Sequence, residues 1–270
     1  MTTRQHRADA PHPPDRARET QTLKRLWEEH TLRPSVGIDY EADYLRSHCA
    51  SDVTLDRRIR VLDMIAPLIR GRVLEWGCRH GLDSCVYRMR FGAGVTLFGC
   101  DACEPELYEH FHAFSGMSYS RLTHPFRLDY DDASFDVVTS NGVLEHVPDD
   151  AASVAEIHRL LRPGGTFAVT CLPNRYSYTE ALQRWRGATA HDRLYSLRGT
   201  RRLLRASGFE VVAARRFFML PTMLNGFPAA VRDAYQSARG VVWPLNDLLE
   251  RAWPLNHLAS NLMITAVKPG

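Results

Sequence analysis

The sequence predicts an α/β protein built on a doubly wound, seven-stranded sheet. The chain has 270 residues, 44% of them hydrophobic, which is enough to bury a sizeable core without disulfides or metals. From residue 71 onward, short apolar runs suited to buried strands alternate with segments of helical periodicity. Such alternation is typical of a parallel sheet with helices on both faces.

The first 70 residues precede the sheet. Residues 1–20 are polar and contain three prolines, so we expect a disordered tail. Residues 21–70 predict a helical extension, with helices over residues 23–30 and 55–69. The second helix places apolar residues on one face, and Gly71 ends it.

Residues 71–216 predict the core of the domain. The strands are expected at residues 72–76, 95–100, 118–122, 135–140, 166–171 and 209–213, and the last strand of the sheet at residues 263–267, within the terminal segment 261–270. Asp149 or Asp150 is expected to cap a helix that stops at Pro163-Gly164-Gly165. Leu203 and Leu204 belong to another helix, which Gly208 ends.

Two insertions interrupt the alternation, at residues 172–202 and 217–260. The second contains Trp243-Pro-Leu-Asn and, ten residues later, Trp253-Pro-Leu-Asn. We expect each proline in the first turn of a helix. Leu245, Leu248, Leu249 and Ala252 then share one face. Such long insertions usually form lids or contact surfaces, so we expect residues 217–260 to be a helical cap over a bound small molecule.

The apolar face of this cap needs a partner. The domain itself, a second subunit in a homodimer, and a membrane surface are three alternatives. The membrane is the least favoured because Asp247, Glu250 and Arg251 supply mixed charge instead of a basic face. Stable insertion into a membrane is not expected, since no apolar run approaches the roughly 20 residues that a span requires.

Composition excludes several functions. Of 34 basic residues only Lys24 and Lys268 are lysines, which rules out P-loop, pyridoxal-phosphate and protein-kinase chemistry between them. A net charge of +3 lacks the signature of a nucleic-acid binder. No signal peptide precedes the six cysteines, so we expect a cytoplasmic protein with reduced thiols. Cys100-x-x-Cys103 has no second pair at zinc spacing, and we expect no metal.

A turn between the first strand and its helix carries most of the chemical information. Glu75 ends the strand, and Gly77 and Gly81 turn the chain into the helix. Glycines at such a turn let the backbone approach a ligand and expose helix N-terminal amides to its anionic end. Asp101 ends the next strand, where a carboxylate can accept bonds from ribose hydroxyls. The alternative interpretation is that Glu75 and Asp101 are surface or capping acids and that the glycines are simple turn residues.

Five segments in order resemble the class I S-adenosylmethionine (SAM) methyltransferases, in particular the type 11 group that includes ubiquinone- and menaquinone-pathway enzymes. The resemblance covers residues 73–212. The matching segments are Val73-Leu-Glu-Trp-Gly-Cys78, Phe98-Gly-Cys-Asp101, Asp131–Val138 with Gly142-Val-Leu-Glu-His146, Leu160-Leu-Arg-Pro-Gly-Gly165 and Ala206-Ser-Gly-Phe-Glu-Val211.

The resemblance implies a Rossmann-like fold that binds SAM and releases S-adenosylhomocysteine. The implied cofactor-binding residues are Glu75, Gly77, Cys78, Arg79, Gly81, Asp101, Ala102 and Asn141. The chain departs from the family pattern at two positions. Arg79 stands where the family usually has glycine, and it would pair with the cofactor carboxylate or block the site. His124 stands where an acid usually faces adenine. A degenerate relative that acts as a binding or scaffold protein is therefore the alternative function.

Methyl transfer requires the nucleophile and the methyl carbon to be held about 3–3.5 Å apart, and a base only where the nucleophile must lose a proton. His146 follows the fourth strand and is the candidate base. The alternative is that its side chain caps the turn or packs in it. Asn174, Tyr176, His191 and Tyr195 are expected to line the acceptor pocket, and Tyr40 and Tyr44 to pack or to close over the cofactor.

These residues predict an enzyme that methylates a hydroxyl, or less favourably an amine, of a sizeable and partly apolar small molecule. A short-chain nicotinamide enzyme is excluded because its Tyr-x-x-x-Lys pair requires an internal lysine. Methylation of nucleic-acid bases is disfavoured because Ser140-Asn-Gly-Val143 does not resemble the Asn-Pro-Pro-Tyr segment of such enzymes.

Overall fold

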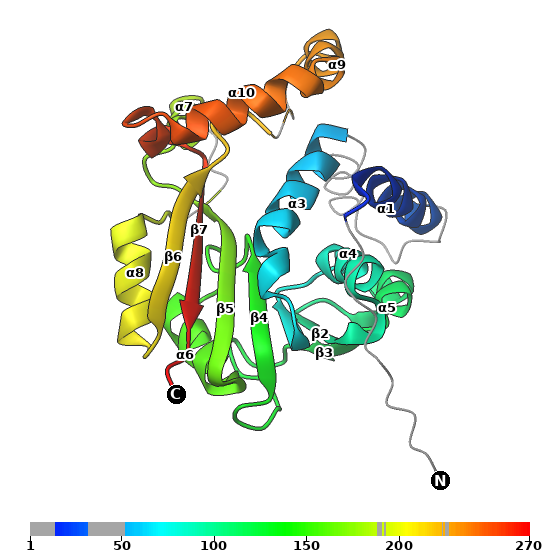
Figure 1. The fold of residues 1–270 in the computed structure, drawn as a ribbon, viewed down its shortest axis with the longest axis vertical. Coiled ribbons are helices and arrows are strands. Elements are labelled where there is room, and N and C mark those ends of the chain that lie inside the picture. Colours follow the sequence, from blue (N-terminus) through cyan, green and yellow to red (C-terminus); the bar gives the residue numbers. More distant parts are fainter. Residues whose placement is uncertain (1–13, 32–51, 188–190, 192, 223, 225–226) are drawn as a thin grey trace.

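The computed structural model describes residues 14–31, 52–187, 191, 193–222, 224 and 227–270. Its centre is one seven-stranded sheet in the order β3-β2-β1-β4-β5-β7-β6 (Figure 1). The strands are β1 (Gly71–Trp76), β2 (Val95–Asp101), β3 (Ser118–Arg121), β4 (Phe135–Asn141), β5 (Leu161–Pro173), β6 (Glu210–Phe217) and β7 (Asn261–Val267). All seven predicted strands are present, which confirms the predicted fold class.

The last strand runs against the parallel arrangement that the alternation predicted. Strands β1 to β5 pair in parallel, whereas β7 is antiparallel to both β5 and β6. The reason lies in the insertion between β6 and β7. Phe217 at the end of β6 pairs with Asn261 at the start of β7, so the chain re-enters the sheet at the end where it left.

Helices cover both faces of the sheet, as predicted. They include α1 (Arg16–Thr31), α3 (Asp52–Ile65), α4 (Leu82–Phe91), α5 (Glu109–Ser115), α6 (Asp150–Leu160) and α8 (Leu197–Ala206). Alternate residues of β1 enter different cores: Val73 packs in the core that includes residues of α1, α3 and α4, and Leu74 in the core that includes residues of α6 and α8. Short 3-10 turns occur at Ala66–Leu68, Gly92–Gly94 and Pro105–Tyr108.

The N-terminal helix begins earlier than predicted. Helix α1 starts at Arg16, within the segment expected to be disordered, and buries Leu23, Leu26 and Trp27. A buried ion pair attaches it to the domain, because Arg90 Nε and Nη2 each donate to the Glu19 carboxylate at 2.7 Å. Asp63 of α3 lies 2.7 Å from the same guanidinium. Arg90, the partner of Glu19, lies 71 positions away in the chain. The start of this helix could therefore not be predicted from the local sequence.

The predicted helix caps differ in outcome. The Asp149 side chain accepts a hydrogen bond from Ala152 N and caps α6, as expected. Pro244, in contrast, lies inside α10 (Arg239–Arg251) and not in a first turn. Pro254 directly precedes the 3-10 turn Leu255–Leu258. The first copy of the repeat therefore begins no helix, because α10 starts at Arg239, five residues before Pro244.

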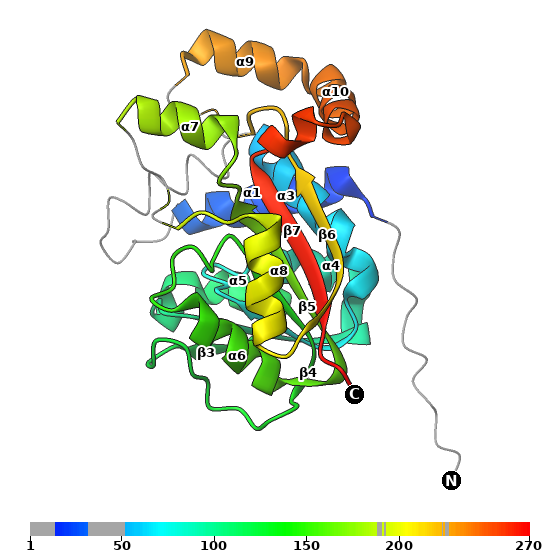
Figure 2. The same cartoon turned by 90° about the vertical axis from the view of Figure 1, so that its left-hand side faces the viewer.

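The cap consists of α9 (Ala229–Ser237), α10 and the turn Leu255–Leu258, with α7 (Tyr178–Trp185) from the first insertion beside them. These helices lie at one end of the sheet (Figures 1 and 2), beyond the carboxyl ends of β4 and β5. Helix α10 buries Val242, Trp243 and Asn246, whereas Leu245 and Leu248 of the predicted apolar face are exposed. None of the described helices combines the length and apolar character that a membrane-spanning helix requires.

Candidate functional site

The turn after β1 has the close packing that its glycines predict. Gly77 has φ +73°, and a Cβ atom there would lie 2.4 Å from Val143 Cγ1. The N–H groups of Gly77 and Cys78 both donate to Cys100 O, at 2.8 and 3.0 Å, which fixes the turn on β2. Gly81 has φ +71° and is the N-cap of α4. The turn is thus a cradle of backbone, and only glycine fits at position 77.

Glu75 lies beneath this cradle. Its side chain is buried, and its Oε2 atom accepts hydrogen bonds from Ser84 N (3.0 Å) and Ser84 Oγ (2.6 Å) in the first turn of α4. Burial and the nearby Asp83 carboxylate raise the pKa of Glu75, against the effect of the Ser84 bonds. The carboxylate therefore holds the start of α4 in place, and any contribution to cofactor binding would act through that helix.

Asp101 stands at the carboxyl end of β2 and is half-buried. Its Oδ2 accepts from Arg79 N and its Oδ1 from Ala102 N, both at 2.7 Å. A carboxylate oxygen can accept more than one hydrogen bond, so each oxygen retains capacity for a ligand hydroxyl. An oriented carboxylate beside a backbone cradle has the donor and acceptor chemistry that a ribose and a neighbouring anionic group require.

Arg79 points toward η3, the 3-10 turn Pro105–Tyr108. Its Nε donates to Tyr108 Oη at 3.3 Å, and His112 Nε2 donates to its carbonyl at 3.2 Å. The residue has φ +45°, in the left-handed region that glycine, the usual family residue, adopts without strain. Arg79 therefore keeps the backbone shape of the loop, and its side chain is held by Tyr108.

A polar chain that the sequence analysis missed joins the cradle to α3. Asn141 Nδ2 donates to Asp83 Oδ2 at 3.0 Å, and Arg58 of α3 forms an ion pair with Asp83 Oδ1. Asp83 is buried. By the helical pattern of residues 55–69 alone, Arg58 is expected on the face that is exposed to solvent. The pairing with α4 needed the tertiary structure.

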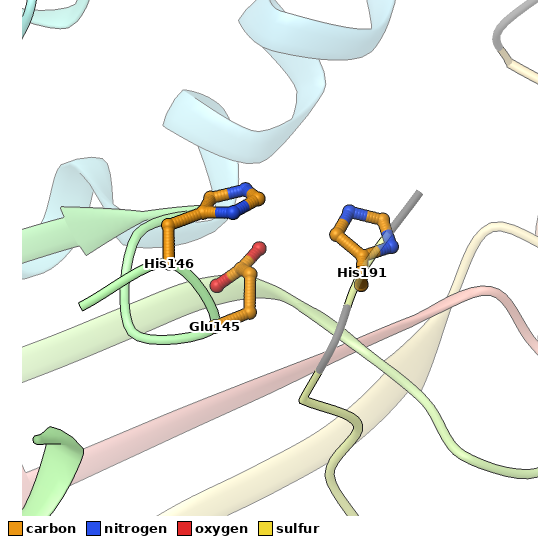
Figure 3. A group of neighbouring side chains, drawn as sticks. All are labelled: Glu145, His146 and His191. Atoms are coloured by element: carbon orange, nitrogen blue, oxygen red, sulfur yellow. The ribbon is translucent and has the colours of Figure 1, made fainter. Parts of the chain in front are cut away.

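A second group of side chains lies after β4. One carboxylate oxygen of Glu145 and one ring nitrogen each of His146 and His191 lie within 4.8 Å of one another, although His191 is 45 residues from His146 in the chain. Figure 3 shows the Glu145 carboxylate between the two imidazoles. The two rings are 5.7 Å apart between centroids. Two imidazoles and a carboxylate at this spacing suit proton transfer, and within the described part of the chain they are also the side chains close enough to share a metal ion.

The electrostatics of this group depend on its burial. Burial raises the pKa of Glu145 to about 7, partly offset by a hydrogen bond from its own backbone N–H and by His191 and Arg57 of α3. The pKa of His191 is raised by Glu180 of α7, whose Oε1 lies 2.9 Å from His191 Nδ1. The pKa values of both groups are therefore raised, so each holds a proton more readily than an exposed group of its kind. His146 is exposed.

Three predicted acceptor residues lie elsewhere. Asn174 is fully buried, and its Nδ2 donates to His257 O and Ala259 O, so it ties β5 to the end of the cap. Tyr195 is buried, and its hydroxyl, which has one proton to donate, lies 2.9 Å from both Leu144 O and Asp150 Oδ2. The polar atoms of both residues are used within the fold, and their place in the acceptor pocket stays a prediction.

Tyr176 is 55% exposed beside Arg175, turned to solvent. Of the four predicted acceptor residues, only His191 joins the group after β4. Tyr40 and Tyr44 lie outside the described residues. The described cysteines, Cys100 and Cys103 among them, form no disulfide with one another.

Comparisons with known proteins agree with this geometry. A family model described as "Methyltransferase domain" matches residues 46–214. A ubiquinone biosynthesis O-methyltransferase from Thiobacillus denitrificans is 37% identical over 130 residues, which are 46% of this chain and 55% of that protein. The chain thus spans about half the length of this curated relative.

Solved structures share the fold. The crystal structure of a SAM-dependent methyltransferase from Thermotoga maritima has a TM-score of 0.60 at 15% identity, with 91% of this chain and 99% of that chain covered. The [4+2]-cyclase SpnF has a TM-score of 0.57 at 19% identity, with 97% and 99% covered. At these identities the likeness concerns the fold alone, and the fold accommodates more than one reaction.

Proposed function

Since this chain belongs to the methyltransferase domain family, we propose that it is a SAM-dependent methyltransferase acting on a hydroxyl of a sizeable, partly apolar small molecule. The observation that carries the proposal is Asp101, oriented by Arg79 N and Ala102 N at the end of β2 beside the Gly77 turn. The named activity of the Thiobacillus relative, O-methylation, supports a hydroxyl over an amine.

In this proposal the cofactor binds at the turn after β1, and the acceptor binds at the group of side chains after β4. SAM, when bound, supplies an electrophilic methyl group. Asp101 would hold the ribose hydroxyls, and the turn between Gly77 and Gly81 would receive the amino-acid portion. Glu145, His146 and His191 would stand on the acceptor side and accept a proton. Holding both reactants in place supplies much of the acceleration of a displacement at carbon.

Isothermal titration calorimetry with S-adenosylhomocysteine tests the cofactor half of the proposal. Asp101→Ala should weaken binding about tenfold or more, because hydrogen bonds to a charged acceptor are worth about 1.5–3 kcal/mol each. Asp233→Ala, at an exposed position of α9, is the matched control. A wild-type protein that does not bind S-adenosylhomocysteine, or an Asp101→Ala variant with unchanged affinity, would contradict the proposal.

We further propose that residues 217–260 cap the acceptor and leave the cofactor cradle unaffected. Their contacts support this, since the cap is attached to α3 through Trp243 Nε1–Asp56 Oδ2 and Arg60 Nη1–Asp247 Oδ1, both 3.1 Å. Phe217 and Asn261 are paired neighbours, so a short Gly-containing turn can join them. That deletion should retain S-adenosylhomocysteine affinity and lose methylation of the native acceptor. Loss of cofactor binding in a folded deletion variant would show that the cap builds the cofactor site.

A further inference from the structure

Glu145 differs from the other buried carboxylates near the site in having an unused oxygen. Within the described residues its Oε2 atom is buried and has no hydrogen-bond partner. Buried carboxylate oxygens are normally bound, and an exception calls for an explanation such as a catalytic role. Glu75 and Asp83, by comparison, are held by Ser84 and by Arg58 with Asn141.

His191 is oriented toward Glu145 by a second acid. Glu180 is buried in α7, and its Oε1 lies 2.9 Å from His191 Nδ1. An ionised carboxylate carries no proton, so Nδ1 must donate and Nε2 remains available as an acceptor when the ring is neutral. A carboxylate that fixes the tautomer of a histidine in this way is a recurring arrangement for proton transfer.

We propose that Glu145 is the general base of the reaction, that His191 receives the proton from it, and that Glu180 is the positioning residue for His191. This rests on the proposed function. The acceptor O–H bond breaks as its proton bonds to Glu145, and the freed oxygen pair bonds to the methyl carbon. The carbon–sulfur bond breaks with its electron pair remaining on sulfur, which loses its positive charge. Glu145 then passes the proton through His191 to solvent.

The charges around Glu145 fit this role. His191 faces it from the segment after α7, Glu180 from α7, Arg57 from α3, and His146 is its chain neighbour. Because burial raises the pKa of Glu145 to about 7, the carboxylate is basic enough to accept a proton and still ionised near neutrality. Methylation governed by this base should increase as the pH rises through about 7.

NMR titration of the full-length protein tests the proton-sharing pair without relying on activity. With ¹³C-labelled histidine, the His191 resonance is assigned from its absence in His191→Gln. Glu180→Gln and Glu145→Gln should each lower the pKa of His191, since both carboxylates favour its imidazolium form. Glu210→Gln, at an exposed position of β6, should leave it unchanged. A His191 pKa that neither of the first two variants changes would overturn the proposal.

Kinetics with SAM and catechol as the acceptor probe then separate the roles. Glu145→Gln should lower kcat about 100-fold or more and remove the rise with pH, with S-adenosylhomocysteine affinity unchanged. Glu180→Gln should alter that pH profile and lower kcat less. If the rise of kcat with pH is lost in His146→Gln but retained in Glu145→Gln, His146 is the base and the proposal is overturned. A bound metal ion that Glu145→Gln releases would also overturn the proposal.

If the protein does not bind S-adenosylhomocysteine, the proposed function is contradicted, whatever the NMR titration of His191 shows. A protein that binds it, but whose His191 is unaffected by both Gln variants, fails only this inference. If catechol is not methylated, the titration of His191 alone decides whether the Glu145–His191–Glu180 arrangement exists.

Discussion

The cofactor cradle and the group after β4 lie at the same end of the sheet, yet their acids are held very differently. In the cradle, Asp101 accepts two backbone N–H bonds and Glu75 accepts two bonds from Ser84. After β4, Glu145 has an oxygen without a partner and a pKa of about 7. The acids of the cradle are held by hydrogen bonds from neighbouring groups, whereas the acid after β4 keeps one buried oxygen without a partner.

This difference teaches which region serves stability and which serves chemistry. Fully bonded polar groups keep a binding site rigid and cost little to bury. A buried acid with an unpartnered oxygen lowers stability, and proteins retain such groups mainly at functional sites. Substitutions in the cradle should therefore destabilise the fold, and one substitution after β4 should stabilise it. Three predictions test this contrast.

The largest effect is expected from Gly77→Ala. A Cβ atom would lie 2.4 Å from Val143 Cγ1 at a φ of +73°, so clash and strain should together lower the free energy of unfolding by about 2–4 kcal/mol. Chemical denaturation measures it. Gly92→Ala is the control, since that glycine has φ +51° but open space around it. Val143→Ala should restore part of the loss, and equal effects of both glycine substitutions would show that the close approach does not matter.

An intermediate effect, opposite in sign, is expected from Glu145→Gln. The folded pKa of Glu145 is about 7 against an ordinary value of 4.5, so ionisation is unfavourable in the folded state. Its stability contribution is present below pH 4.5 and is lost as the pH rises to about 7, by roughly 3 kcal/mol. The variant should thus be more stable than wild type at pH 8, by about 1–3 kcal/mol, and not at pH 4.5.

Denaturation at both pH values decides the matter. Glu75→Gln serves as the comparison from the cradle, because burial raises the pKa of that carboxyl as well, but its Oε2 accepts two hydrogen bonds from Ser84. If Glu145→Gln is less stable than wild type at pH 8, the carboxylate has a structural partner and the contrast between the two regions fails.

The smallest effect is expected from Arg79→Gly. Glycine removes the strain of a positive φ, about 1 kcal/mol, but loses the bond to Tyr108 Oη, worth about as much. The free energy of unfolding should change by less than about 1 kcal/mol. Because the guanidinium is turned to Tyr108, S-adenosylhomocysteine affinity should also change by less than about threefold. Tenfold weaker binding would assign Arg79 to the cofactor carboxylate, and tenfold tighter binding would show that it obstructs the site.

Local sequence was sufficient for the strands and for the cradle. Most strands are short apolar runs, and the Gly77 turn and Asp101 stand at the ends of their strands, so chain order alone places them at one edge of a parallel sheet. The Asp149 cap was readable for the same reason, because a cap bonds to an amide three residues away. Each of these features depends on residues close together in the chain.

Everything that depends on distant residues required the tertiary structure. The direction of β7 follows from where the cap returns to the sheet, and the start of α1 from a bond between Glu19 and Arg90. Asn174 and Tyr195 looked like pocket residues, but the cap and α6 use their polar atoms. Glu145 and His191 become one acid–base group only when α7 brings Glu180 beside them. Sequence order determined the sheet and its cradle, and packing between distant segments decided which polar side chains remained free for chemistry.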